Sequence, residues 1–275
     1  MALLRPRHWI QNSFVLAPLV FSGYFLRANA VREACIGAAL FCLATSTTYI
    51  VNDLYDHNRD HIHRKKSKTR PLASGQIPVR AAWLFLIALY AVLLSGFLLI
   101  PAIMPILLGY ILLNLAYTYY LKNAPPLDIF TVATSYLIRV YAGALAISAP
   151  PSPWMFVTTL ALALFLVSIN RRQEIIDSPT KTRESLKKYS ADLLDRYAEM
   201  SATGALVFYG LFVILEKPQL IVTFPLVVFG MFRYWLIADQ RQNAESPTDA
   251  LLEDKQLLAT IVLWVSTCVW ALWPA

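Results

Sequence analysis

Four long stretches of this chain contain no charged residue, and they limit its possible folds more than any other feature. Asp, Glu, Lys and Arg are all missing from residues 34–52, 81–121, 140–170 and 256–275. A helix that spans a bilayer needs about 20 mostly apolar residues, so residues 81–121 are long enough for two helices with a break near Pro101 and Pro105. The sequence therefore predicts an all-α, polytopic membrane protein.

The composition of the whole chain agrees with this fold class. Of its 275 residues, 57% are hydrophobic and only 15% are charged, whereas a soluble domain carries about 25% charged residues. Because no polar loop is long enough to form a soluble domain, we predict a single transmembrane domain over residues 1–275. The three cysteines, Cys35, Cys42 and Cys268, all lie in apolar stretches, so we interpret them as small core residues rather than as disulfide or metal ligands.

We predict nine membrane-spanning helices. Their approximate ranges are 10–27, 34–52, 81–99, 103–121, 129–147, 154–170, 198–215, 219–237 and 257–273. The first is predicted to be a span and not a cleaved signal peptide, because no small-residue cleavage site follows it and the opening "RPRHW" is typical of an interfacial anchor.

Lys and Arg are distributed unevenly between the two sides of the predicted membrane. One side receives 20 of the 24, namely Arg5, Arg7, seven in the loop 53–80, Lys122, seven in the loop 171–197, Arg233, Arg241 and Lys255. The positive-inside rule places that side, with the N-terminus, in the cytoplasm of a multi-pass protein of the cytoplasmic membrane. The pI of 9.3 then reflects topology and is consistent with an anionic substrate, with no nucleic-acid partner.

Three aspartates follow the second predicted span, at the start of the loop 53–80. Asp53, Asp56 and Asp60 are spaced by three and four residues, so they share one face if the helix continues past Asn52. Carboxylates this close repel one another unless a cation neutralises them, and Mg²⁺ prefers oxygen ligands. Asn52 and Tyr49 would add neutral oxygens. Topology alone does not require carboxylates at the end of a helix, so we interpret the aspartates as metal ligands.

Basic residues follow these aspartates, and they suit an anion that arrives with a metal, such as a diphosphate. The best candidates are Lys66, Lys68 and Arg70, although the positive-inside rule alone also accounts for the lysines. The same loop contains three histidines, His57, His61 and His63, which are weak candidates for zinc ligands. No cysteine accompanies them, and their positions alternate with those of the aspartates.

The second charged loop, 171–197, begins at the end of the sixth predicted span. Asn170 and Glu174 are four residues apart and share a helical face, while Arg171 and Arg172 can bind phosphate through their planar donor groups. The further candidates for anion binding in this loop are Lys187, Lys188 and Tyr189. Membrane anchoring explains the lysines equally well and the paired arginines less well.

One charged residue lies well inside a predicted span. Arg139 stands about ten residues into the fifth span, where a charge is costly, so it should face a polar cavity and have a partner. Asp128 lies eleven residues earlier and is too far along a helix to be that partner.

These residues resemble a known family. The stretch "NDLYDHNRD" has the NDxxDxxxD form of the UbiA-type intramembrane prenyltransferase superfamily. The resemblance implies nine transmembrane helices around a central cavity, with Mg²⁺–diphosphate bound at two acidic motifs on the cytoplasmic side.

The resemblance is most detailed to one branch of that superfamily, the decaprenyl-phosphate phosphoribosyltransferases. The matching stretches include "LLRPRHWIQNSFVLAPL", "KSKTRPLASGQIP", "IFTVATSYLIRVYAGALA" and "RESLKKYSADLLD". Two positions depart from the branch pattern: Gln11 and Asn170 each stand where that pattern has Lys. Two arginines neighbour Asn170, and they are candidates to replace the missing positive charge.

The resemblance implies an enzyme that transfers 5-phosphoribose from phosphoribosyl pyrophosphate to a polyprenyl phosphate, which is a glycosyltransferase reaction. Asn52, Asp53, Asp56 and Asp60 would hold Mg²⁺, and Arg70 with Lys66 and Lys68 would neutralise the leaving diphosphate. Glu174, Arg171 and Arg172 would orient the ribose phosphate. The candidates for the acceptor phosphate are Arg5, Lys122 and Arg139. A homo-oligomer is compatible with this assignment.

Two other functions are compatible with parts of the sequence. An aromatic or quinone-precursor prenyltransferase would have the same fold, but its second DxxxD motif is replaced here by "NRRQE". A non-enzymatic transporter or lipid-binding protein would carry charges near the midplane and discontinuous helices, whereas nearly all charges here lie at one membrane face.

Overall fold

A computed structural model describes residues 2–57, 70–177, 184–240 and 253–274, and this part of the chain contains helices and no strands. Seven helical segments are long and apolar enough to cross a membrane. They are α2 (Ala28–Tyr55), α5 with α6 (Val79–Leu94 and Gly96–Leu99), η4 with α7 (Pro101–Ile103 and Met104–Tyr119), α8 (Leu127–Ala146), α9 (Pro153–Asp177), α11 (Ala191–Glu216), and η6 with α12 (Pro218–Thr223 and Phe224–Gln240). The predicted all-α membrane architecture is therefore confirmed.

The two remaining predicted spans form shorter elements. The last is α14 (Lys255–Ala271), an apolar helix of 17 residues. The first is not one α-helix but a series of pieces: η1 (Ala2–Leu4), η2 (Pro6–Leu16), α1 (Ala17–Phe21) and η3 (Tyr24–Leu26). Because a 3₁₀-helix rises about 2.0 Å per residue, η2 and α1 together reach roughly 30 Å, about the thickness of a hydrocarbon core.

The predicted break inside residues 81–121 is also present. Helix α6 ends at Leu99, Ile100 is non-helical with φ −143° and ψ 81°, and Pro101 begins η4. Proline suits the first position of a helix because its missing N–H would have no partner there.

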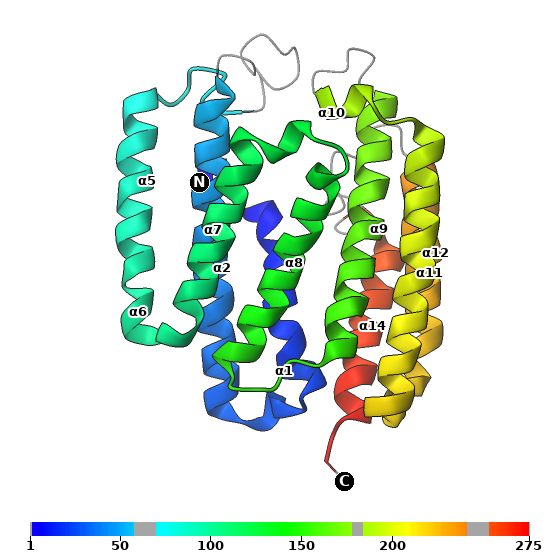
Figure 1. Cartoon of the computed structure of the whole chain (residues 1–275). Coiled ribbons are helices and arrows are strands. Elements are labelled where there is room, and N and C mark those ends of the chain that lie inside the picture. The colour runs from blue at the N-terminus through cyan, green and yellow to red at the C-terminus, as the bar shows by residue number, and fades with distance from the viewer. Residues whose placement is uncertain (1, 58–69, 178–183, 241–252, 275) are drawn as a thin grey trace.

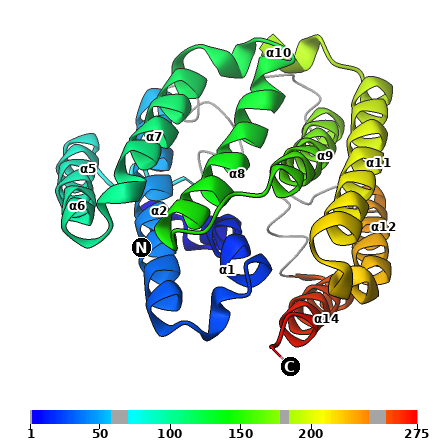
Figure 2. The same cartoon turned by 60° about the horizontal axis from the view of Figure 1, so that its bottom comes forward.

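Successive helices run in opposite directions, and Figure 1 shows the chain passing back and forth through one bundle. Helices α2, α7 and α9 end, and α8 and α11 begin, at the upper end in that view, which we call the site face. The short elements η5 (Leu121–Asn123) and α10 (Glu184–Lys187) lie at the same end. Helix α9 packs along α8 and α11, and α1 lies between α2 and α14 (Figure 2).

The N-terminal segment packs against α8 at a glycine that leaves no room for a side chain. A methyl group on Gly143 would overlap the backbone carbonyl oxygen of Val15, and it would also meet two other backbone atoms of that residue. Only a residue without a side chain lets η2 lie this close to α8. The contact positions the N-terminal segment, and with it Asn12, inside the bundle.

We therefore expect Gly143→Ala to lower stability, because backbone atoms of Val15 must move to admit the methyl group. The cost should be about 1–3 kcal/mol, seen as a lower thermal unfolding midpoint of the protein in detergent. The matched control is Gly109→Ala on the exposed side of α7, where an added methyl group meets nothing within 4 Å. That variant should keep or raise the midpoint, because alanine favours a helix over glycine. Equal midpoints for the two variants would contradict the proposed close contact.

Candidate active site at the end of helix α2

Three of the four predicted metal ligands, Asn52, Asp53 and Asp56, lie at the C-terminal end of α2. Asp53 is in its last turn, and Asp56 is its C-cap residue, whose backbone N–H donates to the carbonyl of Asn52. The C-terminal end of a helix carries about half a negative charge from its free carbonyl groups. Two carboxylates at this position make the local potential strongly negative, so this end of α2 needs cations.

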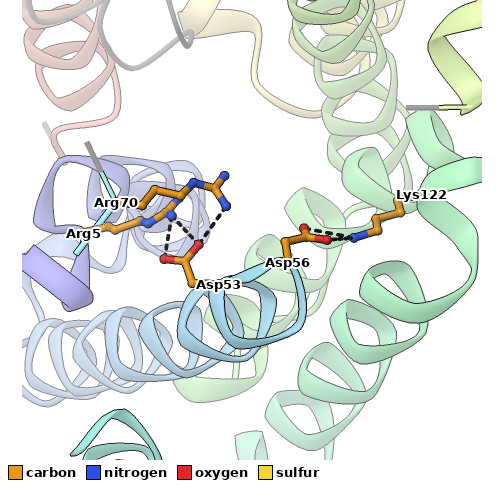
Figure 3. Close-up of polar contacts among 5 residues, drawn as sticks. All are labelled: Arg5, Asp53, Asp56, Arg70 and Lys122. Atoms are coloured by element: carbon orange, nitrogen blue, oxygen red, sulfur yellow. Dashed lines mark hydrogen bonds and ion pairs between the residues drawn. The ribbon is translucent and has the colours of Figure 1, made fainter. Parts of the chain in front are cut away.

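Two guanidinium groups from distant parts of the chain surround Asp53, as Figure 3 shows. Nη2 of Arg5 lies 2.6 Å from Oδ1 and 2.7 Å from Oδ2 of Asp53, and Nη1 of Arg70 lies 3.0 Å from Oδ1. The Asp53 side chain is only 2% exposed. A buried carboxylate of this kind is tolerated because it is paired with cations.

A lysine neutralises the second carboxylate. Nζ of Lys122 donates to both oxygens of Asp56, at 2.8 and 3.0 Å (Figure 3). Lys122 also lies over the ring of Tyr55, 4.7 Å from its centroid. Its own carbonyl accepts a hydrogen bond of 2.9 Å from Ser185, so this one residue connects the end of α2 with the second charged loop.

The chemistry of these two carboxylates fits a magnesium ion that is shared with a substrate. Mg²⁺ typically binds one or two protein carboxylates and completes its shell with phosphate oxygens and water. Asp53 and Asp56 supply such a pair of oxygen donors. The described residues contain no group of three or more His, Cys, Asp and Glu that would form a closed metal site. The fourth predicted ligand, Asp60, lies outside the described residues, as do Lys66 and Lys68.

A second charged cluster lies at the end of α9. Arg171 contacts Glu174 at 2.6 Å and donates a hydrogen bond of 2.7 Å to the hydroxyl of Tyr117. Its Nε lies 3.3 Å from Oδ2 of Asp128, which is fully buried at the start of α8. Tyr189 donates to Oδ1 of Asp128 at 2.7 Å. Two carboxylates thus enclose one guanidinium group.

Burial and the hydrogen bond to Asp128 raise the pKa of Tyr189 well above its ordinary value. Its hydroxyl therefore stays protonated and donates to the carboxylate, whose charge disfavours a phenolate. The role of Tyr189 in this structure is to hold the segment after α10 against the start of α8.

The structure separates the two paired arginines of the second loop. Arg172 turns away from Arg171 and contacts Asp195 of α11 at 2.8 Å and Asp239 of α12 at 3.2 Å. Lys187 and Lys188 are exposed. The side-chain oxygen of Asn170 is buried and has no hydrogen-bond partner among the described residues, so it remains available to a hydroxyl donor.

The intramembrane Arg139 is 2% exposed, and its partners are neutral. Its Nε donates to the amide oxygen of Asn12 at 2.8 Å, Nη2 donates to the hydroxyl of Tyr110 at 3.0 Å, and Nη1 donates to the carbonyl and hydroxyl of Ser135. The guanidinium group also lies over the rings of Tyr110 and Tyr136. In the part of the chain that the structure describes, no carboxylate pairs with this charge.

Tyr49 lies between this buried charge and the carboxylates. The guanidinium group of Arg5 lies over its ring, 5.0 Å from the centroid. One turn earlier on α2, the hydroxyl of Thr45 contacts Asn12 and Tyr110, which are both partners of Arg139. Asn52 stands one turn after Tyr49 on α2 and is half-buried. A column of polar and aromatic side chains thus leads from Asp53 into the bundle.

Sequence reasoning grouped the basic residues differently. Arg5 and Lys122 were expected to join Arg139 as candidates for an acceptor phosphate, but the structure places them on the two aspartates. Asn12, Tyr110 and Ser185 were not predicted to take part. The amide of Asn12 has a detectable signal, since it is a polar residue inside the first apolar segment, whereas nothing local identifies Ser185.

Comparisons with known proteins agree over nearly the whole chain. The model of the UbiA prenyltransferase family matches residues 15–251. The decaprenyl-phosphate phosphoribosyltransferase of Mycobacterium tuberculosis (strain ATCC 25618 / H37Rv) is 30% identical, over 96% of this chain and 91% of its own length. The protein of the same name from Mycolicibacterium smegmatis is also 30% identical, over 96% of this chain and 89% of its own length.

A solved structure has the same fold. A UbiA homolog from Archaeoglobus fulgidus, bound to DMAPP and Mg²⁺, superimposes with a TM-score of 0.73. The alignment covers 98% of both chains at 20% sequence identity. At this identity the likeness concerns the fold alone.

We expect Asp128→Asn to destabilise the protein, because it removes a buried counter-charge of Arg171 and the charged acceptor of Tyr189. Breaking a buried ion pair costs about 3–5 kcal/mol, which thermal unfolding in detergent will detect. Asp239→Asn is the matched control, since its side chain is 65% exposed beside Arg172, and it should cost about 0–1 kcal/mol. An unfolding midpoint of Asp128→Asn as high as that of the control would show that the Arg171 cluster is not needed for stability.

Proposed function

The chain belongs to the UbiA prenyltransferase family, and on that premise we propose that it transfers 5-phosphoribose from phosphoribosyl pyrophosphate to a polyprenyl phosphate. The observation that carries the proposal is the cluster of Asp53, Asp56, Arg5, Arg70 and Lys122 at the end of α2. Carboxylates that bind a metal, beside cations that bind phosphate, are what a diphosphate donor requires. In this proposal the site face is the cytoplasmic face, and the N-terminus lies on that side.

The choice of donor rests on two further points. The full-length relatives at 30% identity are named as phosphoribosyltransferases. In addition, the acid at the second motif, Glu174, is already paired with Arg171 at 2.6 Å. Glu174 is the only acid in "NRRQE", so this stretch lacks the second carboxylate of a DxxxD metal motif. The guanidinium group of Arg171 is close enough to assist a phosphate-bearing donor.

Mg²⁺ would be held by Asp53 and Asp56, with Asn52 and Asp60 as further ligands. When bound, it would supply positive charge to the oxygens of the departing diphosphate. Arg5, Arg70 and Lys122 lie on the same carboxylates, so they would bind the remaining diphosphate oxygens. Glu174 and Arg171 would orient the ribose phosphate, with Arg172 and the exposed Lys187 and Lys188 as weaker candidates.

The reaction breaks the bond between C1 of the ribose and the diphosphate oxygen, which leaves with the electron pair. C1 gains positive character as that bond lengthens, and an oxygen of the acceptor phosphate then forms the new bond from the opposite face. The configuration at C1 is inverted. Because the acceptor phosphate is already negatively charged, no strong base is needed. The protein's part is to position the two anions and to neutralise the growing charge on the leaving group.

Arg139 is the best candidate for the acceptor phosphate. It is a buried cation whose described partners are all neutral, so an anionic ligand would supply the missing counter-charge. A polyprenyl phosphate in the bilayer would bring its phosphate to this depth while its tail lies among the apolar helices.

We expect Asp53→Asn and Asp56→Asn each to lower phosphoribosyl transfer by at least about 100-fold, because each removes negative charge that holds the metal and the donor. The measurement uses purified protein, Mg²⁺, labelled phosphoribosyl pyrophosphate and a polyprenyl phosphate, with detection of the labelled lipid. Asp53→Asn should also lower the unfolding midpoint, because Arg5 and Arg70 lose a buried counter-charge. Transfer is therefore measured at a temperature at which each variant is folded. Full activity in both would refute the metal assignment. Absence of labelled lipid from the unsubstituted protein, with turnover of a prenyl diphosphate and an aromatic acid, would replace the proposal with an aromatic prenyltransferase.

Arg139→Gln should raise the KM for the polyprenyl phosphate at least about tenfold, because it removes a charge-assisted contact worth about 1.5–3 kcal/mol. The KM for phosphoribosyl pyrophosphate should change much less. Arg139→Lys keeps the positive charge and should recover part of the loss, which a purely structural role would not predict because lysine cannot reproduce the planar contacts to Asn12 and Tyr110. Equal changes in both KM values would contradict an acceptor-specific role.

A further inference from the structure

Both carboxylates that would bind the metal are already bound to the protein's own cations. Each oxygen of Asp53 is within 2.7 Å of Arg5, and each oxygen of Asp56 is within 3.0 Å of Lys122. Arg70 adds a second guanidinium group to Asp53 (Figure 3). A metal ion that binds these carboxylates must therefore share them with three cationic side chains or displace those side chains.

The charges in this cluster disfavour a metal ion that arrives alone. Among the described residues, three cations face two carboxylates, so this part of the cluster has one net positive charge. A divalent ion on Asp53 and Asp56 would leave the three cations next to it without their counter-charges, and like charges at these distances repel strongly. A diphosphate that arrives with the metal brings enough negative charge to reverse this balance.

Burial strengthens this constraint at Lys122. Its side chain is 3% exposed, and Asp56 is its carboxylate partner within the described ranges. A buried ammonium group that loses its partner must find another anion or lose its charge. The oxygens of a diphosphate beside Asp56 are such an anion.

The local geometry allows the cations to change partner without moving the helices. The backbone of Lys122 is held by Ser185, so its flexible four-carbon side chain can turn while η5 stays in place. Arg5 lies on the ring of Tyr49, and this ring supports the guanidinium group whichever anion it contacts.

We propose that Arg5, Arg70 and Lys122 keep Asp53 and Asp56 closed to free divalent metal and transfer to the diphosphate when metal and donor arrive together. Metal and diphosphate then bind as an obligatory pair. This inference rests on the proposed function only for the presence of a diphosphate in the donor. It assigns Arg5 and Lys122 to the donor rather than to the acceptor.

The test measures metal binding without turnover. Purified protein in detergent micelles is dialysed to equilibrium against radioactive Mn²⁺, a substitute for Mg²⁺, with and without inorganic pyrophosphate. Bound metal is the excess radioactivity on the protein side, which corrects for Mn²⁺ that pyrophosphate binds in solution. We expect pyrophosphate to lower the apparent Kd of the protein for Mn²⁺ at least tenfold.

The decisive variant is Lys122→Met, which keeps the length of the side chain and removes its charge. It should bind Mn²⁺ at least tenfold more tightly than the unsubstituted protein when pyrophosphate is absent. Addition of pyrophosphate should then lower its apparent Kd for Mn²⁺ by a smaller factor than in the unsubstituted protein. Arg5→Gln should act in the same direction through Asp53, and it keeps the inference testable if Lys122→Met does not fold. Lys217→Met, at the opposite end of α11, is the matched control and should leave Mn²⁺ binding unchanged.

Two results would overturn the inference. In one, the unsubstituted protein binds the same amount of Mn²⁺ with and without pyrophosphate, or binds no Mn²⁺ in either condition. The other is a failure of both Lys122→Met and Arg5→Gln to raise Mn²⁺ binding without pyrophosphate. A purely structural role for the two cations predicts this second result. Because pyrophosphate contains neither ribose nor a prenyl group, failure of the phosphoribosyl transfer assay leaves this outcome unaffected, and the two hypotheses fail separately.

Discussion

The negative end of α2 is the constraint on which the site depends. Asp53 and Asp56 stand where the helix already presents free carbonyl groups, so their charges are tolerated only if cations reach them. The cations come from the N-terminal segment, from the connection between α2 and α5, and from the connection between α7 and α8. Neutralising this one helix end therefore brings three separate parts of the chain together at the site face.

Two other buried arginines, Arg139 and Arg171, have different kinds of partner. Arg139 is a cation surrounded by an amide, hydroxyl groups and aromatic rings, whereas Arg171 lies between two carboxylates and a tyrosine. A guanidinium group between two acids already has its counter-charges within the protein, and its contacts join α7, α8 and α9. A guanidinium group without an acid retains an attraction for anions. The same residue type thus has different capacities at two depths of one bundle.

Much of the architecture was predictable because it depends on local properties. Charge-free runs located the helices, and the prolines after residue 100 located the break between α6 and η4. The prediction was wrong about the form of the first span, because its apolar composition resembles that of an ordinary α-helix. This 3₁₀ segment packs against α8, where Gly143 admits the carbonyl of Val15, and no local signal in residues 6–16 reports that contact.

The sequence by itself determined that this chain crosses a membrane several times, that its acids and bases gather at one face, and that Asp53 and Asp56 share a helix end. Hydropathy, charge and helical spacing decide these features within a few residues of each position. Only the tertiary structure decided which cation meets which anion: Arg5 and Lys122 went to the aspartates, Arg172 turned to α11 and α12, and Arg139 received Asn12, 127 positions away. Such pairings depend on how helices pack, and packing is set by side chains far apart in the chain.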